Sequence, residues 1–184
     1  MSEINTIYGL KPKSIMDRLT RLKLLVCDVD GVFSDGRIYL GNQGEELKAF
    51  HTRDGYGVKA LVNIGIQVAV ITGRRSTLVE QRMSALGVQH IIQGCEKKEQ
   101  ALNILQKKLG ISKDTTAAIG DDMPDIGMFN CAGLSIAVAD AHPFVQKSAV
   151  YITQFGGGRG AVREVCDLIL HAKGQINKID GISL

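Results

Sequence analysis

Two aspartates, Asp28 and Asp30, follow a run of apolar residues and lead into a glycine turn in the segment LVCDVDGVFSDG at 25–36. Burial of a carboxylate is costly without a partner, and two neighbouring carboxylates repel each other, so a structural strand seldom ends this way. Mg²⁺ prefers hard oxygen ligands and binds through carboxylates and substrate phosphate oxygens. The pair therefore indicates a metal-dependent phosphate site, although a DxD pair alone is equally typical of a solvated turn.

A second acidic cluster, GDDMPD at 120–125, also follows an apolar run. Its three carboxylates, which have no basic neighbour, need a cation or a large pKa shift to coexist. The alternating spacing and terminal glutamate of an EF-hand are absent. A structural alternative is an acidic helix start with Pro124 at the first position. The recurrence of the strand-then-acid pattern favours the metal site.

Two further motifs could hold a phosphate. Thr72, Gly73 and Arg74 follow an apolar run, and we expect their hydroxyl and backbone amides to lie at the start of the next helix, where anions bind. Thr72 and Gly73 could instead simply end a strand. Lys98 lies where another apolar run gives way to a helix; with Lys97 it would ordinarily be a solvated helix start, unless acids and a phosphate surround it.

Short apolar runs that alternate with helical patterns indicate the strands and helices that carry these residues. This alternation predicts an α/β fold, a Rossmann-like parallel sheet with helices on both faces, in which ligands bind beyond the carboxyl ends of the strands. The polar motifs are therefore expected to meet at one edge of the sheet. The apolar runs, each too short for an ordinary helix, lie at 23–28, 66–71, 88–92, 115–119, 134–138 and 149–152.

Helical patterns lie between most of these runs, and an amphipathic segment at 15–22 precedes them. Asp54 is a possible helix cap, Thr77 and Glu80 match a capping box, and leucines at helical spacing predict a helix that ends before Gly110.

One interruption breaks the alternation. At 36–51, apolar segments flank a polar turn and predict a β-hairpin. Because the chain has 184 residues and domains average ~100 to 200, we expect one domain over 1–184, with a hairpin insertion at 36–51 and a tail at 174–184.

Composition excludes several classes of protein. The 22 basic and 19 acidic residues are spread along the chain, so nucleic acid is not an expected partner. A signal-like segment and an apolar stretch of the ~20 residues needed to span a membrane are both absent, so we expect a cytoplasmic protein without a membrane partner. The cysteines lack CxxC pairing, which favours free thiols in a reducing compartment; they are Cys27, Cys95, Cys131 and Cys166.

Taken in order, these motifs closely resemble those of the haloacid dehalogenase superfamily of phosphotransferases. The resemblance covers nearly the whole chain, and its four motifs are DVDGV at 28–32, ITGR at 71–74, Lys98 and GDDMPD at 120–125.

The resemblance implies a role for each motif. Asp28 would be the nucleophile that becomes an aspartyl phosphate, and Asp30 the general acid and base. Thr72 and Lys98 would surround the phosphoryl oxygens, together with Gly73. Mg²⁺ would be bound by the side chain of Asp28, the main-chain carbonyl of Asp30 and Asp121. The residues implied to support this site are Asp122, whose direct contact with the metal is left open, and Asp125.

Closer similarity is to capless members of the superfamily that hydrolyse 3-deoxy-D-manno-octulosonate 8-phosphate (KDO 8-phosphate) in lipopolysaccharide sugar synthesis. It is carried by residues 28–59, 138–143 and 156–170. It implies a homo-oligomer, a tetramer built by the hairpins, in which a neighbour's C-terminal segment helps to close the site. Three arginines are candidate contacts for the sugar acid, because guanidinium pairs with carboxylate in bidentate fashion: Arg53, Arg74 and Arg159. Arg53 and Arg159 could equally be surface charges, and Arg74 could instead pair with acids of the site.

Alternatives remain open at this point. A phosphatase for a related nine-carbon sugar acid, a sugar phosphomutase and a catalytically silent binding domain share parts of this pattern. Retention of both Asp28 and Asp30 argues against the silent domain, and a mutase usually needs a cap. His51 and His142 lack ligand spacing, so no catalytic histidine is expected. The glycine run at 156–160 lacks the P-loop order, so ATP binding is not expected.

Overall fold

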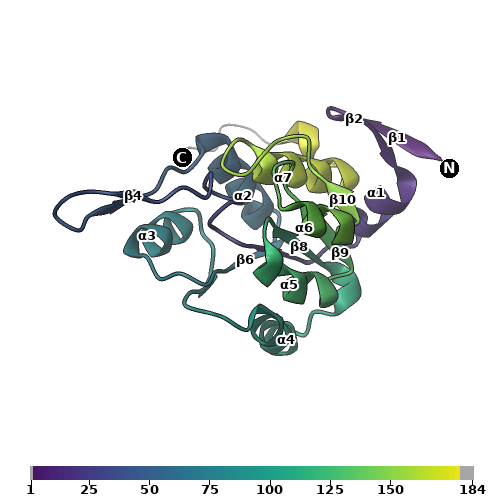
Figure 1. Cartoon of the computed structure of the whole chain (residues 1–184). Coiled ribbons are helices and arrows are strands. Elements are labelled where there is room, and N and C mark those ends of the chain that lie inside the picture. Colours follow the sequence, from purple (N-terminus) through teal and green to yellow (C-terminus); the bar gives the residue numbers. More distant parts are fainter. Residues whose placement is uncertain (1, 179–184) are drawn as a thin grey trace.

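A six-stranded parallel sheet forms the centre of the protein in a computed structural model, which describes residues 2–178 (Figure 1). Its strands run in the order β10-β9-β8-β3-β6-β7. Each predicted apolar run overlaps one strand, which confirms the α/β fold. The strands are β3 (Leu24–Cys27), β6 (Gln67–Ile71), β7 (His90–Ile92), β8 (Thr116–Gly120), β9 (Leu134–Ala137) and β10 (Tyr151–Ile152).

Strand β3 is central, because it pairs with β6 on one side and β8 on the other. Its four residues are fully buried, which explains the continuous apolar run. The register sets Cys27 beside Val70 and Ile119. The three chain segments that follow these strands therefore leave the sheet together at its carboxyl edge.

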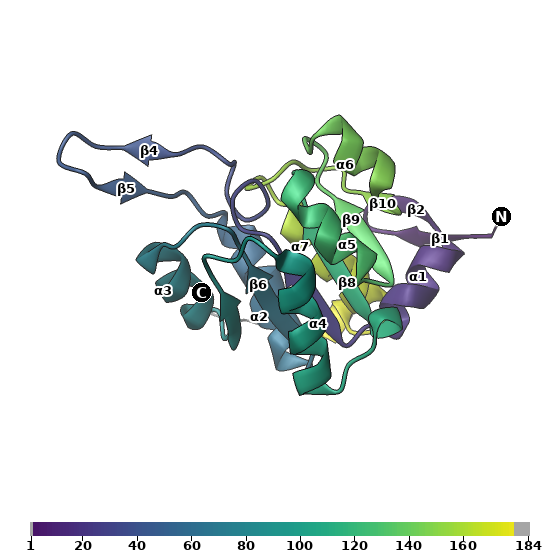
Figure 2. The same ribbon diagram turned by 60° about the horizontal axis from the view of Figure 1, so that its bottom comes forward.

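Helices cover both faces of the sheet (Figure 2). On one face α1 (Lys13–Thr20) and α2 (Thr52–Asn63) pack against α7 (Ala161–Ala172). On the other face α4 (Lys98–Leu109) packs against α5 (Ile126–Asn130). Helix α4 ends where predicted, at Gly110, whose φ of 64° is a conformation that glycine adopts readily. The remaining helical segments are α3 (Thr77–Ala85), α6 (Pro143–Ser148) and 3₁₀ turns at Lys113–Thr115, Met123–Asp125 and Ile176–Lys178.

The prediction of Asp54 as the cap of α2 is wrong. The helix begins earlier, and its cap is His51, whose Nδ1 accepts a hydrogen bond from the Arg53 amide at 3.1 Å. Asp54 instead lies buried in the first turn, where its Oδ1 accepts from the Arg163 amide at 2.7 Å. The carboxylate therefore joins α2 to α7, a long-range contact that local capping patterns do not reveal.

The capping box predicted at the start of α3 is also wrong. The cap position is Ser76, and Thr77 is the first helical residue. The Glu80 carboxylate accepts a hydrogen bond from the Gln93 side chain at 3.0 Å, while the Gln93 side-chain oxygen accepts from the Ser76 amide at 2.8 Å. A side chain from beyond β7 therefore satisfies the helix start.

Two antiparallel hairpins lie outside the central sheet. The first, β1 (Glu3–Thr6) and β2 (Gly9–Pro12), lacks a clear apolar alternation and was not predicted. Its turn is anchored by the Tyr8 hydroxyl, which donates to Asp167 at 2.8 Å. The second, β4 (Tyr39–Leu40) and β5 (Glu46–Leu47), projects from the body of the protein (Figure 2). At its end Leu40 is 74% exposed, so the hairpin presents apolar surface to its surroundings.

Candidate active site

The predicted polar motifs meet at the carboxyl edge of the sheet, in a cleft of about 530 Å³. Asp28 follows β3 directly and its amide donates to Ile119 of β8 at 3.0 Å, so the strand pairing itself places the first aspartate. The predicted site residues that line the cleft are Asp28, Asp30, Thr72, Gly73, Arg74, Lys98, Asp121, Asp122 and Asp125.

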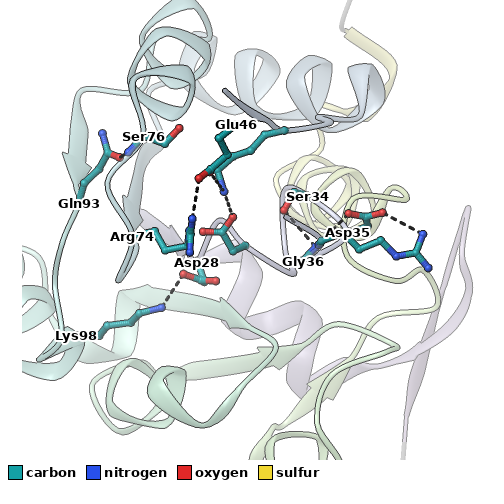
Figure 3. Close-up of polar contacts among 12 residues, drawn as sticks. Asp28, Ser34, Asp35, Gly36, Glu46, Arg74, Ser76, Gln93 and Lys98 are labelled. Atoms are coloured by element: carbon teal, nitrogen blue, oxygen red, sulfur yellow. Dashed lines mark hydrogen bonds and ion pairs between the residues drawn. The ribbon is translucent and has the colours of Figure 1, made fainter. Parts of the chain in front are cut away.

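Lys98 lies between two carboxylates at the base of this cleft. Its Nζ is 2.6 Å from Asp28 Oδ1 and 2.7 Å from Asp125 Oδ1, and the contact with Asp28 is drawn in Figure 3. The lysine side chain is 5% exposed. Although Lys98 is the first residue of α4, it is therefore not a solvated helix start, because both partners hold it inside the cleft.

The electrostatics of these groups follow from burial and from one another. Burial raises the pKa of Asp28 to about 6, although Lys98 opposes the shift; the nearby Asp125 charge adds to it. For Lys98, burial alone would lower the pKa, but the two carboxylates raise it above its usual value. Lys98 therefore stays protonated and supplies a fixed positive charge next to Asp28.

Asp121 has the features of a ligand for a divalent cation. Burial raises its pKa to about 8, and the neighbouring carboxylates Asp28, Asp125 and Asp122 add to the shift. Its Oδ1 is buried and has no hydrogen-bond partner among residues 2–178. Carboxylate oxygens of Asp28, Asp121 and Asp125 all lie within 4.8 Å of one another. A hard cation would neutralise this cluster, so the donor set fits Mg²⁺.

The other two acids of the cluster are engaged in the local turn. Asp125 Oδ2 accepts from the amides of Asp121 at 2.9 Å and Asp122 at 3.3 Å, while its Oδ1 binds Lys98. The exposed Asp122 accepts from the Met123 amide at 2.8 Å and caps the turn that contains Pro124. Asp125 thus shapes the loop that holds Asp121. Asp122 caps the acidic turn that was considered as the structural alternative for this motif.

The loop after β6 differs from the prediction in one respect. Thr72 is buried and its amide donates to Ile92 at 2.9 Å, while its carbonyl accepts from the Cys95 amide at 3.0 Å. Helix α3 begins only at Thr77, so the amides of Gly73 and Arg74 belong to a loop and not to a helix start. The strand end alone brings this loop to the cleft.

Two residues at the base of the projecting hairpin, Glu46 and Lys48, were not predicted and contact residues that line the cleft. Glu46 Oε2 lies 2.8 Å from Arg74 Nη2 (Figure 3), and its Oε1 lies 3.4 Å from Lys48 Nζ. Lys48 also forms an ion pair with Asp30. The signal available in the sequence was the i, i+2 spacing of Glu46 and Lys48, which places both side chains on one side of an extended segment.

Arg53 and Arg159 lie outside the cleft of the single chain. Both side chains are exposed, Arg53 in the first turn of α2 and Arg159 in the glycine-rich loop between β10 and α7. That loop nevertheless contacts the segment after β3, because the Gly158 amide donates to Val32 at 2.9 Å. A side chain at Gly157 would overlap with the carbonyl of Gly31, so the two backbones touch.

A buried carboxylate binds the residues that directly precede the glycine-rich loop. Glu164 of α7 is fully buried, and its Oε2 accepts from the amides of Gln154 at 2.7 Å and Phe155 at 3.3 Å. Its Oε1 accepts from the Tyr151 hydroxyl at 2.5 Å. The residues that lead into the glycine-rich loop are therefore anchored to the core, whereas Arg159 within the loop is exposed.

Comparison with known proteins agrees with this geometry. The model of the haloacid dehalogenase-like hydrolase family matches residues 90–162. The 3-deoxy-D-manno-octulosonate 8-phosphate phosphatase of Yersinia pestis is 50% identical over 98% of this chain and 97% of its own length. A crystal structure of a phosphatase of that name from the same organism has a TM-score of 0.96 at 49% identity, covering 100% of this chain and 99% of the other.

A second solved relative is the 3-deoxy-D-manno-octulosonate 8-phosphate phosphatase of Moraxella catarrhalis, in complex with magnesium, phosphate and KDO. It has a TM-score of 0.89 at 44% identity, covering 91% of this chain and 97% of its own. The similarity extends over the whole chain and includes the strands that carry the acidic cleft. The chain therefore belongs to the 3-deoxy-D-manno-octulosonate 8-phosphate phosphatase family within the haloacid dehalogenase-like hydrolases.

Proposed function

We propose that this protein is a Mg²⁺-dependent phosphomonoesterase that hydrolyses 3-deoxy-D-manno-octulosonate 8-phosphate to the sugar acid and phosphate. The observation that carries the proposal is the group formed in the cleft by buried Asp28 and Lys98 with half-buried Asp121, on a chain that matches phosphatases of that name over nearly its full length. The sugar acid belongs to the lipopolysaccharide pathway.

In the first half of the reaction, a carboxylate oxygen of Asp28 attacks phosphorus and the bond to the sugar oxygen breaks. Asp30 gives its proton to the departing alkoxide. Lys98, held by Asp28 and Asp125, places its charge beside the phosphoryl oxygens, and the Thr72 loop borders the same space. The product of this step is an aspartyl phosphate on Asp28 and the free sugar acid.

In the second half, Asp30 takes a proton from water, whose oxygen attacks the aspartyl phosphate. The bond between phosphorus and the Asp28 oxygen breaks, and inorganic phosphate is released. Mg²⁺, bound by Asp28, Asp121 and the Asp30 carbonyl, would neutralise charge on the phosphoryl oxygens in both halves. Asp125, and Asp122 with it, would support this site by holding the loop that carries Asp121.

A panel of phosphate esters tests the substrate. We expect KDO 8-phosphate to have the highest kcat/KM, followed by nine-carbon sugar-acid phosphates, with neutral sugar phosphates far lower, because Arg74 at the rim of the cleft suits a carboxylate. Release of inorganic phosphate is the measurement. A neutral sugar phosphate with the highest kcat/KM would contradict the proposed substrate class.

The open cleft and the exposed hairpin point to a shared active site in a homo-oligomer, as a tetramer would provide. We propose that the β4–β5 hairpin packs against a neighbour through Tyr39, Leu40 and Leu47, which are 45%, 74% and 63% exposed in the single chain. Arg53 and Arg159 would then contact the sugar acid once subunits assemble. Exclusion of solvent at such a boundary strengthens charge interactions with the substrate.

Substitution of Arg159 tests the shared site. Arg159→Ala should raise KM for KDO 8-phosphate by roughly tenfold or more and leave KM for p-nitrophenyl phosphate nearly unchanged, because the lost contact is to the remote end of the sugar acid. Steady-state kinetics on both esters measure the difference.

Mixed oligomers test whether the arginine acts across subunits. Chains with Arg159→Ala retain Asp28, and chains with Asp28→Asn retain Arg159. In a mixed oligomer, Asp28 of one subunit can therefore share a site with Arg159 of another. At low substrate concentration, the mixture should recover the sugar-acid turnover that each variant alone lacks. A fully active monomer in sedimentation, or mixtures that never recover turnover, would show that the site is not shared.

A further inference from the structure

We propose that Lys48 is a positioning residue for Asp30, because it binds one oxygen of that carboxylate and leaves the other to exchange protons with the substrate. The inference rests on the proposed function, since the acid and base role of Asp30 belongs to it. It assigns the hairpin insertion a role in orienting a residue of the cleft, in addition to the subunit contacts proposed above.

The ion pair between Lys48 and Asp30 is well shielded from water. The side chain of Lys48 is 1% exposed although it comes from the base of a projecting hairpin, and that of Asp30 is 20% exposed. A lysine loses hydration when it is buried, so this position is stable only with a charged partner. The Lys48 Nζ donates its hydrogen bond to Asp30 Oδ1.

The two oxygens of Asp30 therefore differ in their surroundings. Oδ1 is occupied by Lys48, whereas Oδ2 is buried and has no hydrogen-bond partner within the described part of the chain. Asp30 also borders the cleft. A proton donor must be aimed at the leaving oxygen before it can act, and an anchored carboxylate with one free oxygen meets that requirement.

Glu46 holds Lys48 from a second direction. Its Oε2 lies 2.8 Å from Arg74 Nη2 (Figure 3), and its Oε1 lies 3.4 Å from Lys48 Nζ, so the glutamate stands between two cations. Because Lys48 is drawn toward both Asp30 and Glu46, its position is defined by charge on two sides. This arrangement favours a role in orientation over direct binding of the phosphate by Lys48.

The test compares two leaving groups in the first turnover. Lys48→Met should slow release of KDO from KDO 8-phosphate by roughly 10- to 100-fold, because an alkoxide needs a correctly aimed proton donor. Release of p-nitrophenolate should slow by no more than about threefold, because this anion leaves without protonation. Rapid-quench and burst measurements record the two rates.

Matched variants separate orientation from general damage. Lys13→Met makes the same chemical change at a surface ion pair with Asp17, where the lysine is 52% exposed, and should alter neither rate. Lys48→Arg keeps the charge and should recover part of the lost rate on KDO 8-phosphate. Equal losses on both esters for Lys48→Met, or a rise in KM without loss of kcat, would overturn the positioning role.

A double-mutant cycle distinguishes failure of this inference from failure of the proposed function. If Lys48 acts through Asp30, Lys48→Met should have almost no effect in a chain that already carries Asp30→Asn. If the losses of the two single variants multiply in the double variant, the positioning role of Lys48 is refuted, whereas the proposed role of Asp30 is not. If Asp30→Asn itself slows both esters equally, the acid role of Asp30 is wrong and the inference for Lys48 falls with it.

Discussion

Asp28→Asn is expected to abolish turnover, with a loss of at least about 10⁴-fold in kcat, because an amide is a poor nucleophile. The fold should remain intact, since asparagine has nearly the same shape and Lys98 keeps its contact with Asp125 at 2.7 Å. Phosphate release on KDO 8-phosphate and trapping of the aspartyl phosphate by rapid acid quench measure the two expected losses.

The thermal stability of the same variant provides a control with a defined sign. Because burial raises the pKa of Asp28 to about 6, the ionised carboxylate destabilises the folded state at neutral pH. This cost is absent below the ordinary pKa near 4 and complete above about 6. Asp28→Asn should therefore have an equal or higher Tm than the unsubstituted protein at pH 7.5. As a control for activity, the same change at the surface, Asp17→Asn, should leave turnover unchanged. Near-normal turnover by Asp28→Asn would refute its role as nucleophile.

Removal of the metal should have an effect of similar size. A chelator should eliminate turnover and added Mg²⁺ should restore it, because Asp121 has a buried oxygen without a protein partner and lies within 4.8 Å of two other carboxylates. Zinc is not expected to be the preferred ion, since these ligands are hard oxygens. Full activity in metal-free buffer would contradict this mechanism.

The affinity for Mg²⁺ should also depend on pH. The metal binds ionised carboxylates, and the pKa values of Asp28 and Asp121 are raised to about 6 and about 8 before it binds. Affinity should therefore increase as pH rises through this range, with release of protons on binding. Calorimetric titrations in two buffers of different ionisation enthalpy measure the protons released. An affinity independent of pH from 6 to 8 would show that these carboxylates do not bind the ion.

The parallel sheet and its acidic edge could be predicted from the sequence because both depend on local patterns. A buried parallel strand is continuously apolar, and each polar motif directly follows such a run, so strand order was not needed to bring Asp28 and Asp121 together. The prediction of a catalytic Lys98 depended on family resemblance, since a lysine at a helix start looks the same whether it is solvated or buried.

The remaining features depend on contacts between distant segments. Asp54 was expected to cap its own helix, but it binds the backbone of α7. The α3 start is satisfied by Gln93 from beyond the next strand. The i, i+2 spacing of Glu46 and Lys48 places both side chains on one side of an extended segment, but a lysine in a hairpin is ordinarily exposed, and only the fold brings it to Asp30. Local spacing therefore does not identify tertiary partners of this kind.

The contact between Gly157 and Gly31 has a consequence for the order of folding. The loop that follows Asp28 is synthesised well before the glycine-rich loop that touches it, because most strands of the central sheet lie between them in the sequence. Contacts between segments so far apart form slowly, because a long loop must close before they stabilise anything. A nascent chain can thus pair β3 with β6 well before the loop that follows Asp28 has its final contacts. The candidate active site is consequently expected to be among the last parts of the molecule to reach its final shape.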